Sequence, residues 1–261
     1  MARRPAPPRP SDALAAVVAA ATDELAGRDP ALARLVAATG PCGLGVPREL
    51  THFGSLCRSI TFQQLAGRAA ATIFGRFVAV ATGGREPIDL TPEGVLACSV
   101  ESLRGAGLSA AKTRSIRALA ERVAGGELPL DDVEGIGDEE LIERLTAVPG
   151  IGRWTAEMFL IFQLGRLDVW PVGDLGVRKG YGTAWGLAEP PTPKELAAHG
   201  DAFRPYRSVA AWYCWRAVDT VLPDSPPKPP PPKAAAPRPP SPPGSATGTK
   251  AAAPRPPKPA R

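Results

Sequence analysis

Apolar residues recur with the 3.6-residue period of α-helices over most of the chain between residues 11 and 222. The periodic segments are rich in Ala and Leu and are separated by Gly, Pro or helix-capping residues, whereas alternating β-branched runs are nearly absent. The pattern therefore predicts an all-α fold of about a dozen short helices in two lobes. The helices are predicted to begin near Ser11, Asp29, Glu49, Ala66, Thr91, Ser99, Ser109, Asp138, Arg153, Asp174, Thr192 and Arg204.

Both ends of the chain differ in composition from this helical part. Residues 1–10 and 223–261 consist mainly of Pro, Ala, Arg and Lys, and they hold too little apolar surface to offset the entropy of ordering. We therefore expect disordered basic, Pro-rich tails there. The helical domain is expected over residues 11–222, with a hairpin of two helices at 139–164.

The excess of positive charge belongs to the C-terminal tail. The chain has 31 basic and 26 acidic residues and a formal net charge of +5, but residues 223–261 hold seven of the basic residues and one acid. The first 222 residues are thus nearly neutral, so charge alone does not indicate that the helical part binds nucleic acid. The basic tail is suited to a salt-sensitive attraction to polyanions that does not depend on their sequence.

The apolar segment at residues 13–21 resembles the core of a signal peptide. However, it follows several prolines and Asp12, and two acids close it, so an ordinary first helix capped by Ser11 or Asp12 is favoured. No apolar run approaches the roughly 18 residues that span a membrane, and we expect no membrane association.

The cysteines carry no metal-binding pattern. The four of them lie far apart without CxxC spacing, and the chain has only two histidines, His52 and His199. A zinc site, a disulfide framework and a four-cysteine iron–sulfur cluster are therefore not expected. Reduced thiols are typical of a cytoplasmic protein.

The most informative segment is LTAVPGIGRWTAEMFLIFQL at residues 145–164. Two predicted helices flank a short connection with Gly150 and Gly152, and the glycines permit the second helix to turn sharply back. Amides at such a helix N-terminus point outward and can bind a phosphate. A plain helix–helix turn without a ligand remains open on this segment alone.

Asp174 opens the next predicted helix, in the sequence WPVGDLGVR. By itself it could be a simple N-cap. Together, however, the hairpin and this aspartate resemble the helix-hairpin-helix (HhH-GPD) DNA glycosylases, in which a Gly- and Pro-containing turn precedes the catalytic aspartate by a similar distance.

The resemblance extends over residues 48–220 to the 3-methyladenine DNA glycosylases, which repair alkylated DNA. ITFQQLAGRAAATIFGRF from Ile60, LRGAGLSAAKTRSIRALA from Leu103 and RPYRSVAAWYCW from Arg204 match three of their segments in the same order. Only about 40 residues precede the first match, too few for the β-rich N-terminal domain of larger members. The chain therefore resembles the compact form.

The resemblance implies that Asp174 stabilises a sugar with oxocarbenium character and orients the attacking water. A helix N-terminus stabilises its negative charge. Members with lyase activity carry a Schiff-base lysine one residue after the position of Arg153; here that residue is Trp154, so no lyase activity is expected.

Aromatic residues surround the extruded base in this family, and Trp154 and Trp215 fall on matching positions. Indole faces attract the positive charge of alkylated purines, although two core tryptophans are the alternative. Trp170, Tyr181 and Trp185 are weaker candidates that suit packing better.

The resemblance also implies the contacts with duplex DNA, from which the target nucleotide must be flipped. Gln64, with Leu65 beside it, matches the wedge that fills the gap, although the pair Gln63 and Gln64 could simply cap the next helix. Further residues match positions that contact the DNA backbone in this family. Others match positions whose main-chain carbonyls bind a monovalent cation (Na or K), and no other cofactor is expected. The backbone-binding set is Gly150, Gly152 and Arg153, with Lys112 as a plausible addition, and the cation set is Thr146, Val148 and Ile151.

The sequence thus predicts a monofunctional DNA glycosylase that excises alkylated purines, such as 3-methyladenine and 7-methylguanine, in base excision repair. Its partner would be damaged double-stranded DNA, and we expect a cytoplasmic monomer, nucleoid-associated in a bacterium. Two alternatives stay open: a glycosylase for deaminated or mismatched bases, and a non-catalytic helix-hairpin-helix module. Asp174 separates the last from an enzyme, because a mere binder has no need of an acid beside the DNA.

Overall fold

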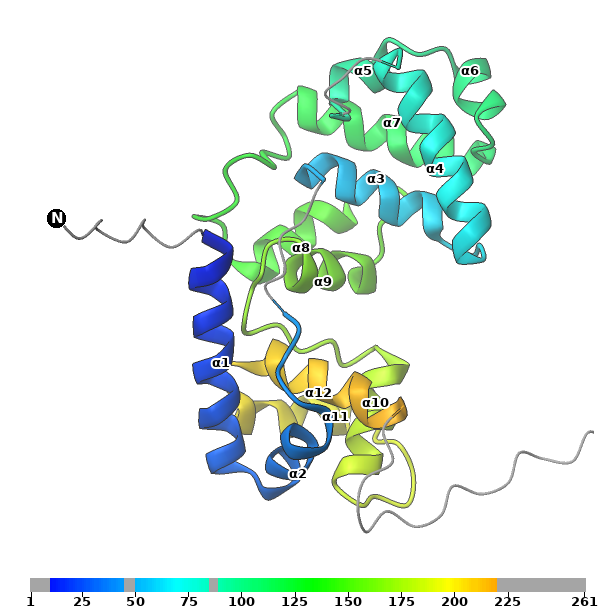
Figure 1. Ribbon diagram of the computed structural model, residues 1–261. Coiled ribbons are helices and arrows are strands. Elements are labelled where there is room, and N and C mark those ends of the chain that lie inside the picture. Colours follow the sequence, from blue (N-terminus) through cyan, green and yellow to red (C-terminus); the bar gives the residue numbers. More distant parts are fainter. Residues whose placement is uncertain (1–9, 45–49, 85–88, 220–261) are drawn as a thin grey trace, which may run out of the picture. The chain divides into compact units, whose positions relative to one another are not determined.

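The described part of the computed structural model, residues 10–44, 50–84 and 89–219, is helical and contains no strand. It has twelve α-helices and one 3₁₀ helix, as the periodicity predicts (Figure 1). They are α1 (Pro10–Arg28), α2 (Pro30–Thr39), α3 (His52–Phe62), α4 (Gly67–Thr82), α5 (Pro92–Leu96), α6 (Val100–Gly105), α7 (Ala110–Ala124), α8 (Asp138–Thr146), α9 (Arg153–Phe162), α10 (Leu175–Ala184), α11 (Pro193–His199), η1 (Gly200–Phe203) and α12 (Arg207–Asp219).

Side-chain caps fix half of the helix starts that the sequence predicts. At six of the twelve predicted starts, an oxygen of the residue before the helix accepts a hydrogen bond from a first-turn amide, which satisfies a donor that the helix itself leaves free. These capping residues are Asp29, Thr91, Ser99, Ser109, Asp174 and Thr192.

Three predicted starts need comment. Helix α1 begins at Pro10, ahead of both proposed caps and one residue inside the predicted N-terminal tail. Helix α3 begins at His52 with Thr51 as its cap, and the predicted start at Glu49 lies outside the described residues. The start predicted at Arg204 is wrong: α12 begins at Arg207, because Arg204 precedes a proline and is extended, with ψ 143°.

The helices pack in two groups, as predicted (Figure 1). In one group α12 packs against α1, α2, α10 and η1; in the other, α3 to α7 pack together and α3 also contacts α9 of the pair α8 and α9. Buried apolar side chains from both groups form one continuous core. The remaining tail residues, 1–9 and 223–261, lie outside the described residues.

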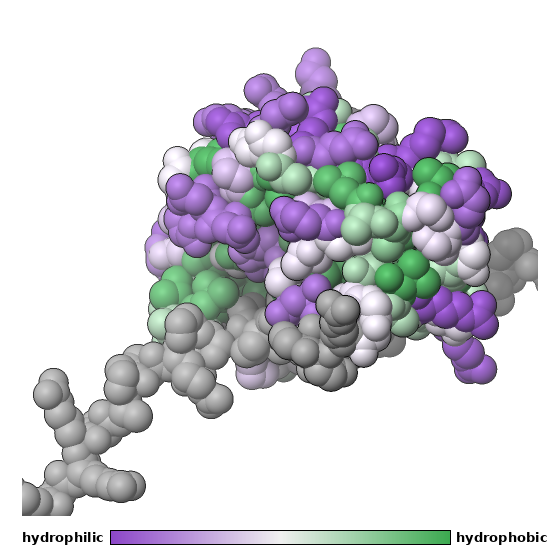
Figure 2. All heavy atoms as spheres, turned by 90° about the horizontal axis from the view of Figure 1, so that it is seen from above, coloured by the Kyte–Doolittle hydropathy of each residue, from purple (hydrophilic) through white to green (hydrophobic). Residues whose placement is uncertain are grey.

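Among the residues that the structure describes, seven large apolar side chains are exposed. On the face seen in Figure 2, apolar side chains lie in several separate areas between polar ones. The exposed residues are Val17, Leu65, Val80, Val100, Trp154, Leu175 and Leu187, of which Trp154 and Leu175 adjoin the site described below. No described helix is long and apolar enough to cross a membrane.

Candidate active site

The turn between α8 and α9 contains two glycines. One of them is required by the packing, and the other has open space for a side chain. Gly150 has φ +87°, and a Cβ there would overlap Ser115 Oγ on α7, so this turn is seated closely on α7. Gly152 has ordinary extended backbone angles, and a Cβ there would meet nothing within 4 Å. The prediction that both glycines permit the turn is thus wrong for Gly152. No side chain caps α9, so its first-turn amides remain available to a ligand.

Asp174 holds three hydrogen bonds and is almost buried. Its Oδ1 caps α10 by accepting the Val177 amide at 2.8 Å, and it also accepts Trp215 Nε1 at 2.9 Å. Its Oδ2 accepts Trp154 Nε1 at 2.6 Å. The side chain is only 8% exposed. A capping role for Asp174 therefore does not exclude a catalytic one: Oδ1 fixes the start of α10, and Oδ2 faces the exposed indole of Trp154.

The two predicted pocket tryptophans meet at this carboxylate although they come from different helices. Trp154 on α9 is 53% exposed, which excludes the core alternative for it. Trp215 on α12 is half-buried and packs against Phe162, with ring centroids 5.4 Å apart. An acid framed by two indoles, one of them exposed, suits a flat cationic group beside the carboxylate.

The weaker aromatic candidates pack inside the protein, as expected. Trp170 is buried, contacts Phe203 and donates its Nε1 to the Leu196 carbonyl at 2.8 Å. Tyr181 stacks on Trp185 with ring centroids 4.3 Å apart. These rings belong to the packing around α10.

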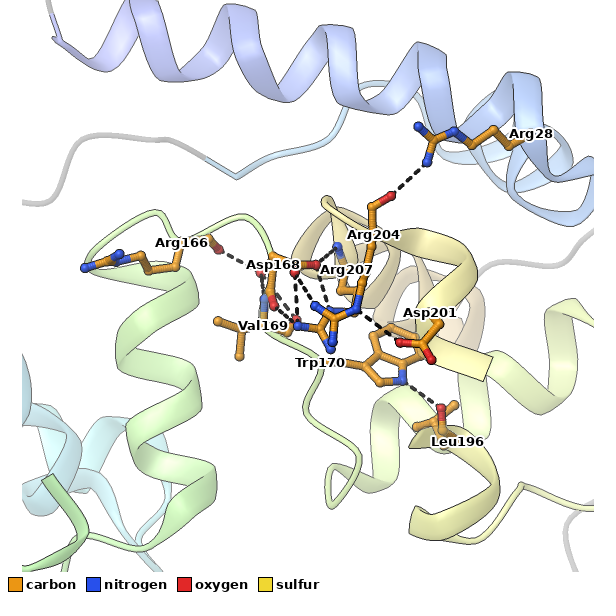
Figure 3. A network of polar contacts seen from close by, with 10 residues as sticks. Arg28, Arg166, Asp168, Val169, Trp170, Leu196, Asp201, Arg204 and Arg207 are labelled. Carbon is orange, nitrogen blue, oxygen red and sulfur yellow. Dashed lines mark hydrogen bonds and ion pairs between the residues drawn. The ribbon is translucent and has the colours of Figure 1, made fainter. Parts of the chain in front are cut away.

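A polar network holds the connection between α9 and Asp174 (Figure 3). Asp168 accepts Arg204 Nη1 at 2.8 Å and Arg207 Nε at 2.7 Å. Ser208 Oγ donates to the Arg166 carbonyl at 2.7 Å and accepts the Val169 amide at 3.0 Å. The segment that leads to Asp174 is thereby fixed to the start of α12, the helix that carries Trp215. Sequence reasoning missed Asp168, because its partners Arg204 and Arg207 are 36 and 39 positions away.

Two glycines of α10 allow this helix to approach α12. A Cβ at Gly176 would lie 2.8 Å from Trp215 Cδ1 and 3.0 Å from Asp174 Oδ1. A Cβ at Gly180 would overlap the Cys214 carbonyl oxygen. Sequence reasoning missed both, although their spacing of four in a predicted helix is a sign of close helix contact.

Comparison with known proteins shows the family of this chain. The model of the HhH-GPD superfamily of base excision DNA repair proteins matches residues 57–205, more than half of the chain. The chain belongs to this superfamily. The matched range contains the hairpin, Trp154 and Asp174 but ends before Trp215.

The HhH-GPD relatives include DNA-3-methyladenine glycosylase 1 of Schizosaccharomyces pombe, 41% identical over 165 residues, or 63% of this chain and 71% of the relative. A solved structure of the 3-methyladenine DNA glycosylase from that yeast, in complex with abasic DNA, has a TM-score of 0.64 and 38% identity and covers 76% of this chain and 95% of the other. A DNA-3-methyladenine glycosidase from Bacillus halodurans has a TM-score of 0.68 and 40% identity, covering 76% and 88%.

In this HhH-GPD chain, the predicted wedge lies in an exposed turn between α3 and α4. Gln64 is exposed with φ +56°, and Leu65 is 40% exposed. The alternative that the two glutamines cap α4 is wrong: Ala66 precedes the helix without a side-chain cap. The Gln63 side chain instead donates to the Gly150 carbonyl at 2.9 Å, and so it joins this turn to the hairpin.

The two predicted cationic contacts are both engaged within the protein. Arg153 pairs with Glu139 through two hydrogen bonds of 2.7 and 3.0 Å and with Glu157 at 2.9 Å. A DNA phosphate would have to compete with these carboxylates for Arg153. Burial raises the pKa of Glu157, while the Arg153 guanidinium partly offsets that rise. Lys112 Nζ donates to two carbonyls of the α3–α4 turn, and desolvation lowers its pKa.

Proposed function

We propose that this protein is a monofunctional DNA glycosylase that excises alkylated purines of the 3-methyladenine and 7-methylguanine type from damaged duplex DNA. The observation that carries the proposal is Asp174, a nearly buried carboxylate held by three N–H donors between Trp154 and Trp215. The similarity to 3-methyladenine DNA glycosylases supports the alkylated substrate. A non-catalytic module would gain nothing from a fixed carboxylate that repels phosphates.

The carboxylate stabilises the sugar as its bond to the base breaks. The bonding electron pair leaves with the base, and a cationic alkylated purine thereby departs neutral, without needing a proton from the enzyme. The positive charge that develops on the sugar lies opposite Asp174. A water molecule then adds its oxygen to the anomeric carbon and gives its proton to the carboxylate or to solvent.

The hydrogen bonds of Asp174 support different roles for its two carboxylate oxygens. Oδ1 is tied to Val177 and Trp215 and keeps the side chain in place. Oδ2 bonds only to the exposed Trp154, so it is the oxygen that can face the sugar and the water when that indole turns toward the base.

DNA is held by the hairpin and by the neighbouring α3–α4 turn, which Gln63 joins to the hairpin. The free amides at Gly150 and Gly152 suit a phosphate, and Gln64 with Leu65 suits the space left by the flipped nucleotide. The carbonyl oxygens of Thr146, Val148 and Ile151 are hard ligands that would hold a monovalent cation; Val148 O also accepts the Ile151 amide at 3.1 Å. Such an ion would supply positive charge toward the phosphate. We propose that the protein acts as a monomer.

Base release from duplexes that each carry one lesion tests the proposal. We expect free 3-methyladenine and 7-methylguanine from the wild-type protein, measured by chromatography of the released bases. Release of only uracil, thymine or other deaminated and mismatched bases would favour the second enzyme reading. Binding without release of any base would leave a DNA-binding module.

The product should be an intact abasic strand. Trp154 stands where a Schiff-base lysine would be, so no amine attacks the sugar. Borohydride added during turnover is therefore expected to trap no protein–DNA adduct, and the strand should break only after hot alkali. A covalent band on a denaturing gel would contradict this prediction.

The ring face and the N–H of Trp154 should each make a separate contribution to the rate of base release. Trp154→Phe keeps an aromatic face but removes the donor to Asp174 Oδ2, whereas Trp154→Leu removes both. Indole attracts a cation by roughly 0.5–2 kcal/mol, so the leucine variant should lose more activity on 7-methylguanine than on neutral hypoxanthine. The measurement is the single-turnover rate of each variant relative to wild type on each substrate. Equal relative losses on both would show that the indole only packs or stacks.

A further inference from the structure

The turn between α3 and α4 is held in an unfavourable conformation. Among the described residues, Gln64 alone of the non-glycine residues has a positive φ, at +56°. A side chain in this left-handed region costs conformational free energy and persists where the surroundings determine it. Contacts that fix the residues just before Gln64 help to hold this conformation.

Lys112 fixes this turn from α7. Its ammonium group donates to the Thr61 carbonyl at 2.7 Å and to the Gln63 carbonyl at 2.8 Å. These carbonyls belong to the C-terminal end of α3, where the helix leaves acceptors free and where positive charge is favourable. The lysine thus holds both carbonyls just before Gln64.

The same turn is joined to the hairpin. Gln63 Nε2 donates to the Gly150 carbonyl at 2.9 Å, across 87 positions of sequence. Gly150 in turn has no room for a Cβ, because Ser115 Oγ on α7 occupies that space. Lys112 and Ser115 lie three residues apart, about one helical turn, so α7 supports both turns side by side.

We infer that Gln63 and Lys112 are positioning residues that lock the α3–α4 turn to the hairpin, so that the wedge and the phosphate-binding amides meet the DNA in one fixed register. The inference rests on the proposed function, since it assigns these residues a part in flipping the damaged nucleotide. Neither side chain touches the reacting atoms. Both act through Gln64 and Leu65, whose side chains stay exposed.

The test compares one lesion in paired duplex and in single-stranded DNA. A flipped nucleotide leaves a gap only in the duplex, so the wedge matters only there. Lys112→Met and Gln63→Met keep most of the side-chain volume and remove the donors. Because small displacements of positioning groups cost up to about a hundredfold, we expect a loss of about tenfold or more in single-turnover rate on the duplex and a clearly smaller loss on the single strand.

Two controls separate positioning from charge and from folding. Arg114→Met removes one positive charge from the exposed side of the same helix and should lower the rates on both substrates by similar, small factors. Lys112→Arg keeps a donor for the two carbonyls and should recover part of the duplex rate. Thermal unfolding of each variant identifies any that fail to fold.

A double-mutant cycle gives a second measurement. In a background with Gln64→Ala and Leu65→Ala, Lys112→Met should add little further loss on the duplex, because the group it positions is gone. Additive losses, or equal losses of the single variants on duplex and single strand, would overturn the inference. A wild-type protein that releases no base from either substrate would instead contradict the proposed function.

Discussion

Replacing Asp174 by Asn is expected to lower the single-turnover rate of base release by about a hundredfold or more while binding to abasic duplex changes little. The transition state loses the negative charge opposite the sugar, whereas the proposed DNA contacts, at the hairpin amides and at Gln64 with Leu65, do not include this carboxylate. Asn is also a good N-cap, so it can still accept the Val177 amide, and the helix start should persist. The rate is measured with excess enzyme on a 7-methylguanine duplex.

The chain offers a closely matched control in Asp29. Asp29 Oδ1 caps α2, and Asp29 Oδ2 accepts a hydrogen bond from the indole N–H of Trp185 at 3.0 Å. Asp174 has the same arrangement, since its Oδ1 caps α10 and its Oδ2 accepts the indole N–H of Trp154. Asp29→Asn therefore makes the same chemical change away from the exposed indole, and it should leave the rate near that of wild type. If Asp174→Asn kept more than about a tenth of the wild-type rate, a loss below roughly 1.4 kcal/mol, the catalytic role would be wrong.

Gly180→Ala is expected to lower the free energy of unfolding by at least about 3 kcal/mol, because its Cβ would overlap the backbone oxygen of Cys214. A backbone atom cannot avoid the overlap by a rotamer change, as a flexible side chain can. The helices α10 and α12 must therefore move apart. For a domain of this size the loss corresponds to a fall in melting temperature of roughly 6–12 °C. Base release should also fall, since the two helices carry Asp174 and Trp215.

Gly75→Ala is the matched control for this substitution. Gly75 lies within α4, and a Cβ there meets nothing within 4 Å. Alanine should then stabilise the protein by about 0.5–1 kcal/mol through its higher helix propensity. Thermal and urea unfolding of both variants provide the measurement. A Gly180→Ala protein as stable as wild type would show that α10 and α12 are not in the close contact described here.

The helices themselves could be predicted because their causes are local. The 3.6-residue period, the capping residues and the prolines act within a few positions, so starts such as those capped by Thr91, Ser109 and Thr192 follow from neighbouring residues. Where a start was wrong, as at Arg204, the local rule that disfavours helix before proline had been overlooked. The two-group fold and the family followed from the order of motifs.

The composition of the site was also predictable in part. The resemblance to the family indicated Asp174, Trp154 and Trp215, and the structure brings these three together. The catalytic, pocket, wedge and DNA-backbone roles of individual residues stay predictions, which the experiments above address. Leu175, 53% exposed beside Asp174, was missed, because an apolar residue in the first turn of a helix gives no sign of facing outward.

What the sequence by itself determined, then, is which residues begin helices, that the chain is all-α and which motif carries the acid. Only the tertiary structure decided that Asp174 is shared between a helix cap and two indoles, that Arg153 is paired with carboxylates, and that Gln63 joins the α3–α4 turn to the hairpin while Lys112 on α7 holds the same turn. The physical reason is the separation along the sequence of the residues that interact. Periodicity and capping depend on neighbours along the chain, whereas a hydrogen bond across 87 positions or a missing Cβ between two helices depends on how separate helices pack.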